Sequence, residues 1–191
     1  LWSAGASVPS VVAWWLAFLV LTIAGERLEL SRFLPPSAAA RRTFGGIVGL
    51  VGAGLLTATW PWGQVLFGTG LVALAIWLLK QDVARRTVRA RGLTRFMAMC
   101  MLSGYAWLAI GGAIVVAAGG LAPGTASYDA ALHALGLGFV FSMVFGHAPV
   151  IVPSVVRAAV PYHATFYAPL FLLQLSLAVR LWGDVTGDFD L

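Results

Sequence analysis

Two histidines, His133 and His147, lie fourteen positions apart in one of the most hydrophobic stretches of the sequence. On an α-helix, fourteen residues turn by about 1,400°, roughly 40° short of four full turns, and rise by about 21 Å. Both imidazoles are therefore predicted to lie on one helix face, separated by most of a bilayer core of about 30 Å. Because ionisable side chains inside a membrane are costly and rare, each one predicts a functional site. Neutral imidazole is an axial ligand of haem iron, so the spacing predicts haem b at one or both of these levels.

Small and basic residues accompany both histidines, as a haem site requires for the ring and its propionates. At the outer level the sequence offers Gly136 and Arg180 beside His133. At the inner level it offers Gly146, Arg157 and His163. The candidate cofactor-binding residues are therefore His133, His147, Gly136, Arg180 and His163, with His133 and His147 as the metal ligands.

Each of these side chains also has a purely structural interpretation. A membrane histidine often forms a hydrogen bond with a neighbouring helix, and His147 could bond a carbonyl freed by the nearby Pro149. Arg180 could pair with Asp184 four residues later at the membrane surface. Open space beside the histidines would favour a cofactor, whereas direct hydrogen bonds from both to carbonyl groups would favour a cofactor-free scaffold.

A group of soft ligands precedes the histidines in the sequence. Its members are Met97, Met99, Cys100 and Met101, and thioether and thiolate groups suit Cu(I). These positions do not share one helix face, and methionine is common in apolar cores. The pattern therefore favours core packing over a copper site.

The histidine spacing resembles that of cytochrome b in the quinol–cytochrome c reductases, where one helix contributes a ligand to each of two stacked b haems. That family has two such helices, and this sequence has one. Here a sixth ligand would have to come from a second copy, a partner subunit, His163 or a methionine.

A longer resemblance covers the stretch from His133 to Met143 (HALGLGFVFSM), followed by Phe145 and Gly146. It looks like a helix of the NnrS-type membrane proteins. The resemblance implies association with haem and copper, a link to nitric oxide metabolism, and a distant similarity to the catalytic subunit of haem–copper oxidases. The chain has about half the usual length of that family and too few histidines for a complete haem–copper centre.

The elements that position these residues are predicted to be membrane helices. The sequence is 60% hydrophobic and 10% charged, whereas soluble domains carry about 25% charged residues. Six windows are long enough to span a bilayer: 9–24, 44–59, 63–79, 96–118, 130–156 and 165–182. We expect an all-α integral membrane bundle of six helices, up-and-down with short loops, forming a single domain over residues 1–191. In the second helix, Gly45 and Gly49 form a GxxxG pair that predicts close helix packing.

The basic residues predict the orientation of this bundle. Eleven of the twelve lie around three predicted loops, namely Arg27, Arg32, Arg41 and Arg42, then Lys80, Arg85, Arg86, Arg89, Arg91 and Arg95, and finally Arg157. The opposite side carries Asp129, Asp184, Asp188 and Asp190, with Arg180 as its base. Short cytoplasmic loops collect Lys and Arg, which predicts an inner-membrane protein with both termini on the periplasmic side. A topogenic loop attracted to anionic headgroups explains the basic run at 85–95, so no nucleic-acid partner is expected.

We therefore expect a b-type cytochrome-like subunit that carries electrons in a respiratory or nitric-oxide-related complex. Its partners would be the lipid bilayer and other membrane subunits or a second copy. No catalytic residue is predicted, and the small share of extramembrane sequence indicates a subunit rather than a complete enzyme. The alternative is a cofactor-free structural subunit, which the dense glycine and abundant tryptophan fit equally well. A transporter is less favoured, because the broken-helix signal at Pro149 and Pro153 occurs only once.

Overall fold

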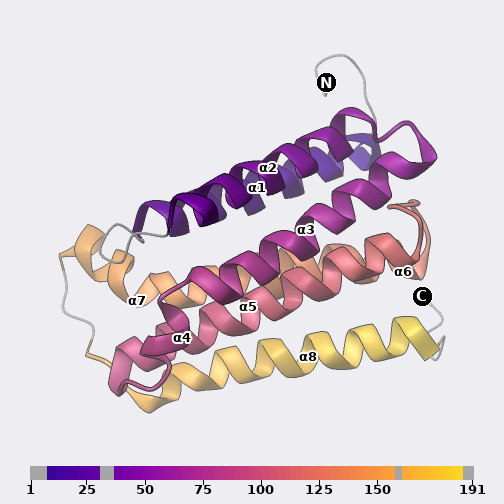
Figure 1. The fold of residues 1–191 in the computed structure, drawn as a ribbon. Helices are drawn as coiled ribbons and strands as arrows, with labels where there is room; N and C mark the ends of the chain where they lie inside the picture. Colours follow the sequence, from indigo (N-terminus) through magenta and orange to yellow (C-terminus); the bar gives the residue numbers. More distant parts are fainter. Residues whose placement is uncertain (1–7, 31–36, 158–160, 187–191) are drawn as a thin grey trace.

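Most of the described part of the chain is helical. The computed structural model describes residues 8–30, 37–157 and 161–186, and these contain no strand. The elements are α1 (Val8–Leu30), α2 (Ala38–Leu56), α3 (Pro61–Gln81), α4 (Ala84–Thr87), α5 (Gly92–Ala117), α6 (Ala126–His133), the π-helix η3 (Ala134–Phe141), α7 (Ser142–Val156), the 3-10 helix η4 (Ala164–Phe166) and α8 (Tyr167–Thr186) (Figure 1). The prediction of an all-α fold is confirmed for these residues.

The long helices run side by side and reverse direction from one to the next (Figure 1). At one end of the molecule, α1, α3 and α7 finish while α2, α5 and α8 begin. We call this the basic end, because ten described bases lie there: Arg27, Arg41, Arg42, Lys80, Arg85, Arg86, Arg89, Arg91, Arg95 and Arg157. The opposite, acidic end carries Asp129 and Asp184 beside Arg180. Arg32, Asp188 and Asp190 lie outside the described residues.

Five of the helical segments are long and apolar enough to cross a membrane. They are Val11–Glu29, Trp62–Gln81, Gly92–Ala117, Ala126–Val156 and Ala164–Asp184. Helix α2 is not among them, because it begins before the predicted span 44–59 and takes in Arg41 and Arg42, which leaves a shorter apolar part. The predicted count of six membrane-spanning helices is therefore not confirmed.

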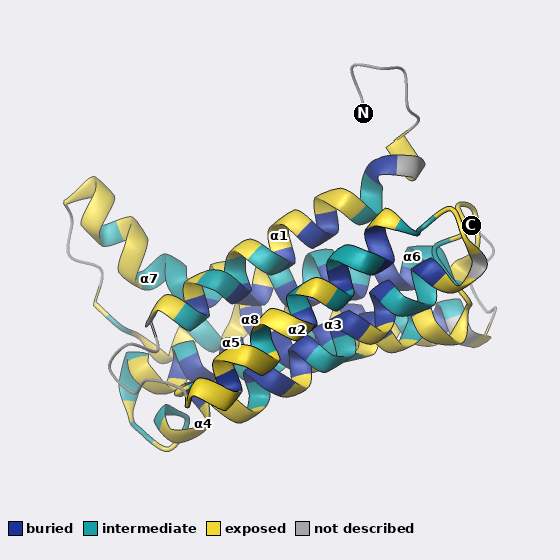
Figure 2. Ribbon diagram, turned by 45° about the horizontal axis from the view of Figure 1, so that its top comes forward, coloured by how far each residue is buried: buried dark blue, intermediate teal, exposed yellow. Residues whose placement is uncertain are grey.

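The surface supports a membrane location. Large apolar side chains are exposed along α8, namely Phe171, Leu172, Leu175, Val179 and Trp182. Figure 2 shows that the last turns of α7 are also largely exposed and project beyond the other helices. Contiguous apolar surface of this extent is costly in water, whereas lipid tails solvate it favourably. The chain thus has the exterior of a multi-pass membrane protein.

Glycines allow the backbones of α3 and α5 to approach closely. A Cβ atom on Gly112 would lie 2.8 Å from the carbonyl oxygen of Gly68, and a Cβ atom on Gly68 would lie 2.8 Å from that of Gly112. The GxxxG pair of α2 behaves differently, because no atom of the described chain lies within 4 Å of a Cβ built on Gly45 or Gly49. The predicted close helix packing at this pair therefore does not occur within the described chain, where both glycines are exposed.

The histidine-bearing helix has an unusual centre. The segments α6, η3 and α7 form one continuous rod, and its middle eight residues are a π-helix with i→i+5 hydrogen bonds. A π-helical stretch of this length takes up about one extra residue, which rotates everything beyond it by roughly 100°. The prediction that His133 and His147 share one face assumed an unbroken α-helix, and the π-helix interrupts that helix between the two histidines.

The π-helix fits against α5 through small residues. A Cβ atom on Gly138 would lie 2.5 Å from Cγ of Trp107, and one on Gly111 would lie 2.7 Å from the Leu135 side chain. Phe139 and Leu135 of η3 are fully buried in the main core. The irregular segment is therefore held by packing against α5.

Candidate functional site

His147 presents a buried ring nitrogen that has no partner. Its Nδ1 lies 2.5 Å from the carbonyl oxygen of Met143, one turn earlier in α7. Because a carbonyl can only accept, Nδ1 donates and Nε2 carries the lone pair of the neutral ring. This Nε2 is buried and forms no hydrogen bond. Metal-binding histidines typically anchor one nitrogen in this way and coordinate through the other.

Local sequence explains the position of this side chain. Gly146 lets α7 approach α5, since a Cβ there would lie 3.1 Å from Cβ of Cys100 and 3.4 Å from the carbonyl oxygen of Met97. Gly146 thus serves helix packing, so it is not an open slot for a cofactor edge. The close approach places the neighbouring His147 at the level of the Met97–Met101 turn of α5.

The outer candidate residues converge on an acid. Arg180 donates to Oδ2 of Asp129 from Nη2 at 2.6 Å and from Nε at 3.1 Å, and its Nε lies 3.5 Å from Oδ1 of Asp184. His133 Nδ1 lies 2.9 Å from the carbonyl oxygen of Asp129 and 3.2 Å from its Oδ2. The structure therefore brings His133 and Arg180 together through Asp129, which links α6 to α8.

The carboxylate of Asp129 already accepts the hydrogen bonds of Arg180 that a haem propionate was expected to accept. Sequence reasoning assigned Asp129 only to the outer side, although its place four residues before His133 could have indicated the contact. Gly136 lies on the same rod, and no described atom is within 4 Å of a Cβ built there. The outer group is thus an ion-pair cluster beside an open glycine.

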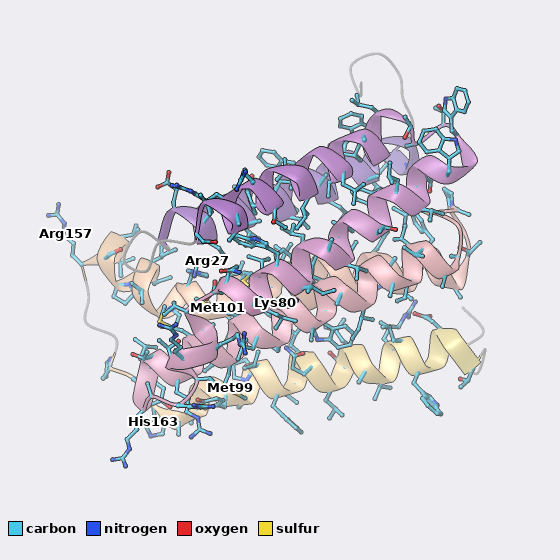
Figure 3. All side chains as sticks on the ribbon, viewed as in Figure 1. Arg27, Lys80, Met99, Met101, Arg157 and His163 are labelled. Atoms are coloured by element: carbon cyan, nitrogen blue, oxygen red, sulfur yellow. The ribbon has the colours of Figure 1, made fainter. Side chains whose placement is uncertain are left out.

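The remaining inner candidates point away from the bundle. His163 is exposed, and its Nδ1 accepts the Thr165 N–H at 3.3 Å, so it caps η4. Arg157 is exposed, with φ of 53°, at the projecting end of α7. Figure 3 shows both side chains directed outwards. Neither is brought to His147.

The soft-ligand group does not converge either. Met99 is exposed, whereas Cys100 and Met101 are buried, and Figure 3 shows Met99 and Met101 on different sides of α5. Within the described residues, no three His, Cys, Asp or Glu side chains are grouped as a metal site.

A groove of about 190 Å³ lies between α2 and α3 at the basic end. It is lined by Ala40, Thr43, Ile76, Trp77, Lys80 and Gln81. No histidine lines it, and its volume is below the range of typical small-molecule pockets.

Two polar groups, one half-buried and one buried, were missed by sequence reasoning. Gln174 of α8 donates to Oγ of Ser142 at 3.1 Å and to Oγ of Ser103 at 3.3 Å, and it accepts a hydrogen bond from Nε1 of Trp107. An amide inside the apolar window 165–182 was the available signal. The other group is Arg27, which was assigned to a loop but is 8% exposed in the last turn of α1.

Comparison with known proteins gives a family without a known activity. Residues 1–191 match the family described as "Domain of unknown function (DUF8744)". No curated protein and no solved structure matches the chain.

Proposed function

The chain belongs to the DUF8744 family, and we propose from its own residues that it is a b-type cytochrome-like membrane subunit that binds haem through His147. The observation that carries this proposal is the buried Nε2 of His147, which has no hydrogen-bond partner while Nδ1 is anchored on Met143. An unpartnered buried polar atom is costly, and coordination of iron would satisfy it. The bound haem would supply one-electron chemistry in a respiratory or nitric-oxide-related complex.

The surroundings of His147 support haem binding more than the surroundings of His133 do. The backbone of Met97 in α5 lies beside Gly146, so the sixth ligand would come from a methionine of this turn or from a partner subunit. At the outer level, Arg180 and His133 both bind Asp129, so the proposal does not extend to a haem at His133.

The proposed setting is the inner membrane with the basic end in the cytoplasm. The ten described bases at that end support this orientation through the excess of Lys and Arg in cytoplasmic loops. In this arrangement His147 lies towards the cytoplasmic side, and electrons would be exchanged with partner subunits.

Purified protein tests the proposal directly. We expect a Soret band that shifts on dithionite reduction, together with haem iron in a pyridine haemochrome assay. His147→Ala should remove the band, whereas the matched variant His133→Ala should keep it. A folded, colourless protein without haem iron, or full haem retention in His147→Ala, would contradict the proposal.

A second candidate function is a cofactor-free scaffold of a membrane complex. Two observations favour it. Both helix histidines bond carbonyls one turn earlier on their own helix, and polar clusters join α8 to α5, α6 and α7. A colourless preparation that still assembles with partner subunits would select this function.

A further inference from the structure

Arg27 is a buried cation without a hydrogen-bonded anion. Its side chain is 8% exposed, and Figure 3 shows it beside Met101, between α1 and α5. Nη1 donates to Sδ of Met101 at 3.5 Å, while Nε is buried and has no partner. A thioether is a weak acceptor, and arginine does not lose its proton in proteins. The positive charge is therefore retained in an apolar interior.

Asp82, whose carboxylate bonds Tyr105 of the neighbouring α5, forms hydrogen bonds with groups other than Arg27. Asp82 accepts the Ala84 N–H at Oδ1 (2.7 Å) and the Tyr105 hydroxyl at Oδ2 (2.7 Å). Arg27 itself forms no ion pair with a described carboxylate. Because a buried charge is strongly unfavourable unless it is paired and hydrogen-bonded, the free guanidinium nitrogen calls for an anion from outside the chain.

The surroundings indicate the chemistry of that anion. A guanidinium matches phosphate in a bidentate geometry. Arg27 lies at the basic end, where nine other described bases outnumber the acids Glu26, Glu29 and Asp82. Basic pockets between transmembrane helices on the cytoplasmic side bind phospholipid headgroups. The exposed apolar residues of the same helix, Trp15, Phe18 and Leu19, provide a surface for acyl chains.

We propose that Arg27 binds the phosphate of an anionic phospholipid whose headgroup enters the basic end between α1 and α5. Nε and the second terminal nitrogen donate to the phosphate oxygens, while Met101 holds Nη1. The lipid would fix the last turn of α1 against α5. This site does not rest on haem at His147, although both lie beside the Met97–Met101 turn of α5.

Lipid titration of the detergent-purified chain tests the site. Native mass spectrometry and thermal unfolding would be followed with dioleoylphosphatidylglycerol, dioleoylphosphatidylcholine or inorganic phosphate. Wild-type protein should retain one phosphatidylglycerol and unfold at a higher temperature in its presence. Arg27→Met should weaken this binding roughly tenfold or more, as expected for loss of charge-assisted hydrogen bonds. Arg89→Met, which removes an exposed base at the same end, should bind like wild type.

Further measurements distinguish lipid phosphate from free phosphate, and they test the Arg27 site independently of haem binding. Protection of wild type by inorganic phosphate alone, lost in Arg27→Met, would identify free phosphate as the ligand and support the anion site. The His147→Ala variant should keep the lipid response, so a failed haem assay leaves this test intact. If Arg27→Met does not fold, Arg27→Lys should bind more weakly than wild type. Equal binding by wild type and the folded Arg27 variants, or no binding by wild type, would overturn the proposal.

Discussion

At the scale of single residues, the chemistry of this chain is concentrated in a few polar side chains inside apolar helices. His147 has one nitrogen anchored and one free, whereas His133 shares its donor with the backbone and side chain of Asp129. Gln174 satisfies three partners from two other helices. The distinction between a satisfied and an unsatisfied polar atom, rather than residue type, separates structural positions from candidate ligand sites.

Gln174→Leu should destabilise the protein by about 1–2 kcal/mol. The substitution leaves the indole N–H of Trp107 and two serine hydroxyls without their partner, and unsatisfied buried groups cost about this much. Unfolding of the detergent-solubilised protein would measure the difference. Ser176→Ala is the matched control, because Ser176 is exposed and bonds only the Leu173 carbonyl of its own helix; equal stability of the two variants would reject the role of the amide.

At the scale of elements, close packing of α5 against both α3 and the π-helix organises the candidate site. Gly112 meets Gly68 of α3, and Gly111 meets Leu135 of η3, so two neighbouring glycines face different partners. The π-helix interrupts the α-helical periodicity between α6 and α7, and α7 carries His147.

Gly112→Ala and Gly49→Ala should have opposite effects on stability. A Cβ on Gly112 would lie 2.8 Å from the Gly68 carbonyl oxygen and 3.0 Å from side chains of α3, so overpacking should cost about 1–3 kcal/mol. A Cβ on Gly49 meets nothing within 4 Å, and alanine is the better helix former by about 0.5–1 kcal/mol. Monomeric protein in detergent should show this contrast in its unfolding midpoint. Destabilisation of the monomer by Gly49→Ala would contradict the open environment of this glycine.

At the scale of the whole molecule, the basic residues are gathered at one end of the helical bundle. The basic end holds ten described bases, and the acidic end holds the Asp129–Arg180–Asp184 cluster. The excess of Lys and Arg in cytoplasmic loops is the basis of the proposed orientation, with the basic end in the cytoplasm.

Thiol labelling should place the two ends on opposite sides of the membrane. In a Cys100→Ala background, which removes the single native thiol, Ala122→Cys at the acidic end should react with a membrane-impermeant maleimide in intact cells. Arg89→Cys at the basic end should react only after the membrane is opened. Both positions are exposed, so accessibility within the fold is matched. Labelling of Arg89→Cys in intact cells would reverse the orientation.

Local interactions made much of the fold predictable from sequence. Apolar stretches bounded by charged or loop residues predicted helices because each helix satisfies its backbone hydrogen bonds within itself, as a membrane requires. The same patterns predicted that His133, Arg180 and Asp184 lie at a similar depth, near the outer end of the bundle. Composition alone did not determine the number of membrane-spanning helices, since the extent of α2 depends on whether Arg41 and Arg42 join the helix.

By itself, the sequence determined that this chain is helical and apolar outside, with its bases gathered in the loops of one end. Only the tertiary structure decided which polar atoms find partners: Asp129 takes Arg180, Gln174 joins three helices, and Nε2 of His147 and Nε of Arg27 remain unpaired. The physical reason is that partners come from neighbouring helices far away in sequence, and the π-helix alters the facing of every residue beyond it. The hydrophobic periodicity along one helix shows neither which distant side chains become partners nor where a π-helix interrupts the α-helix.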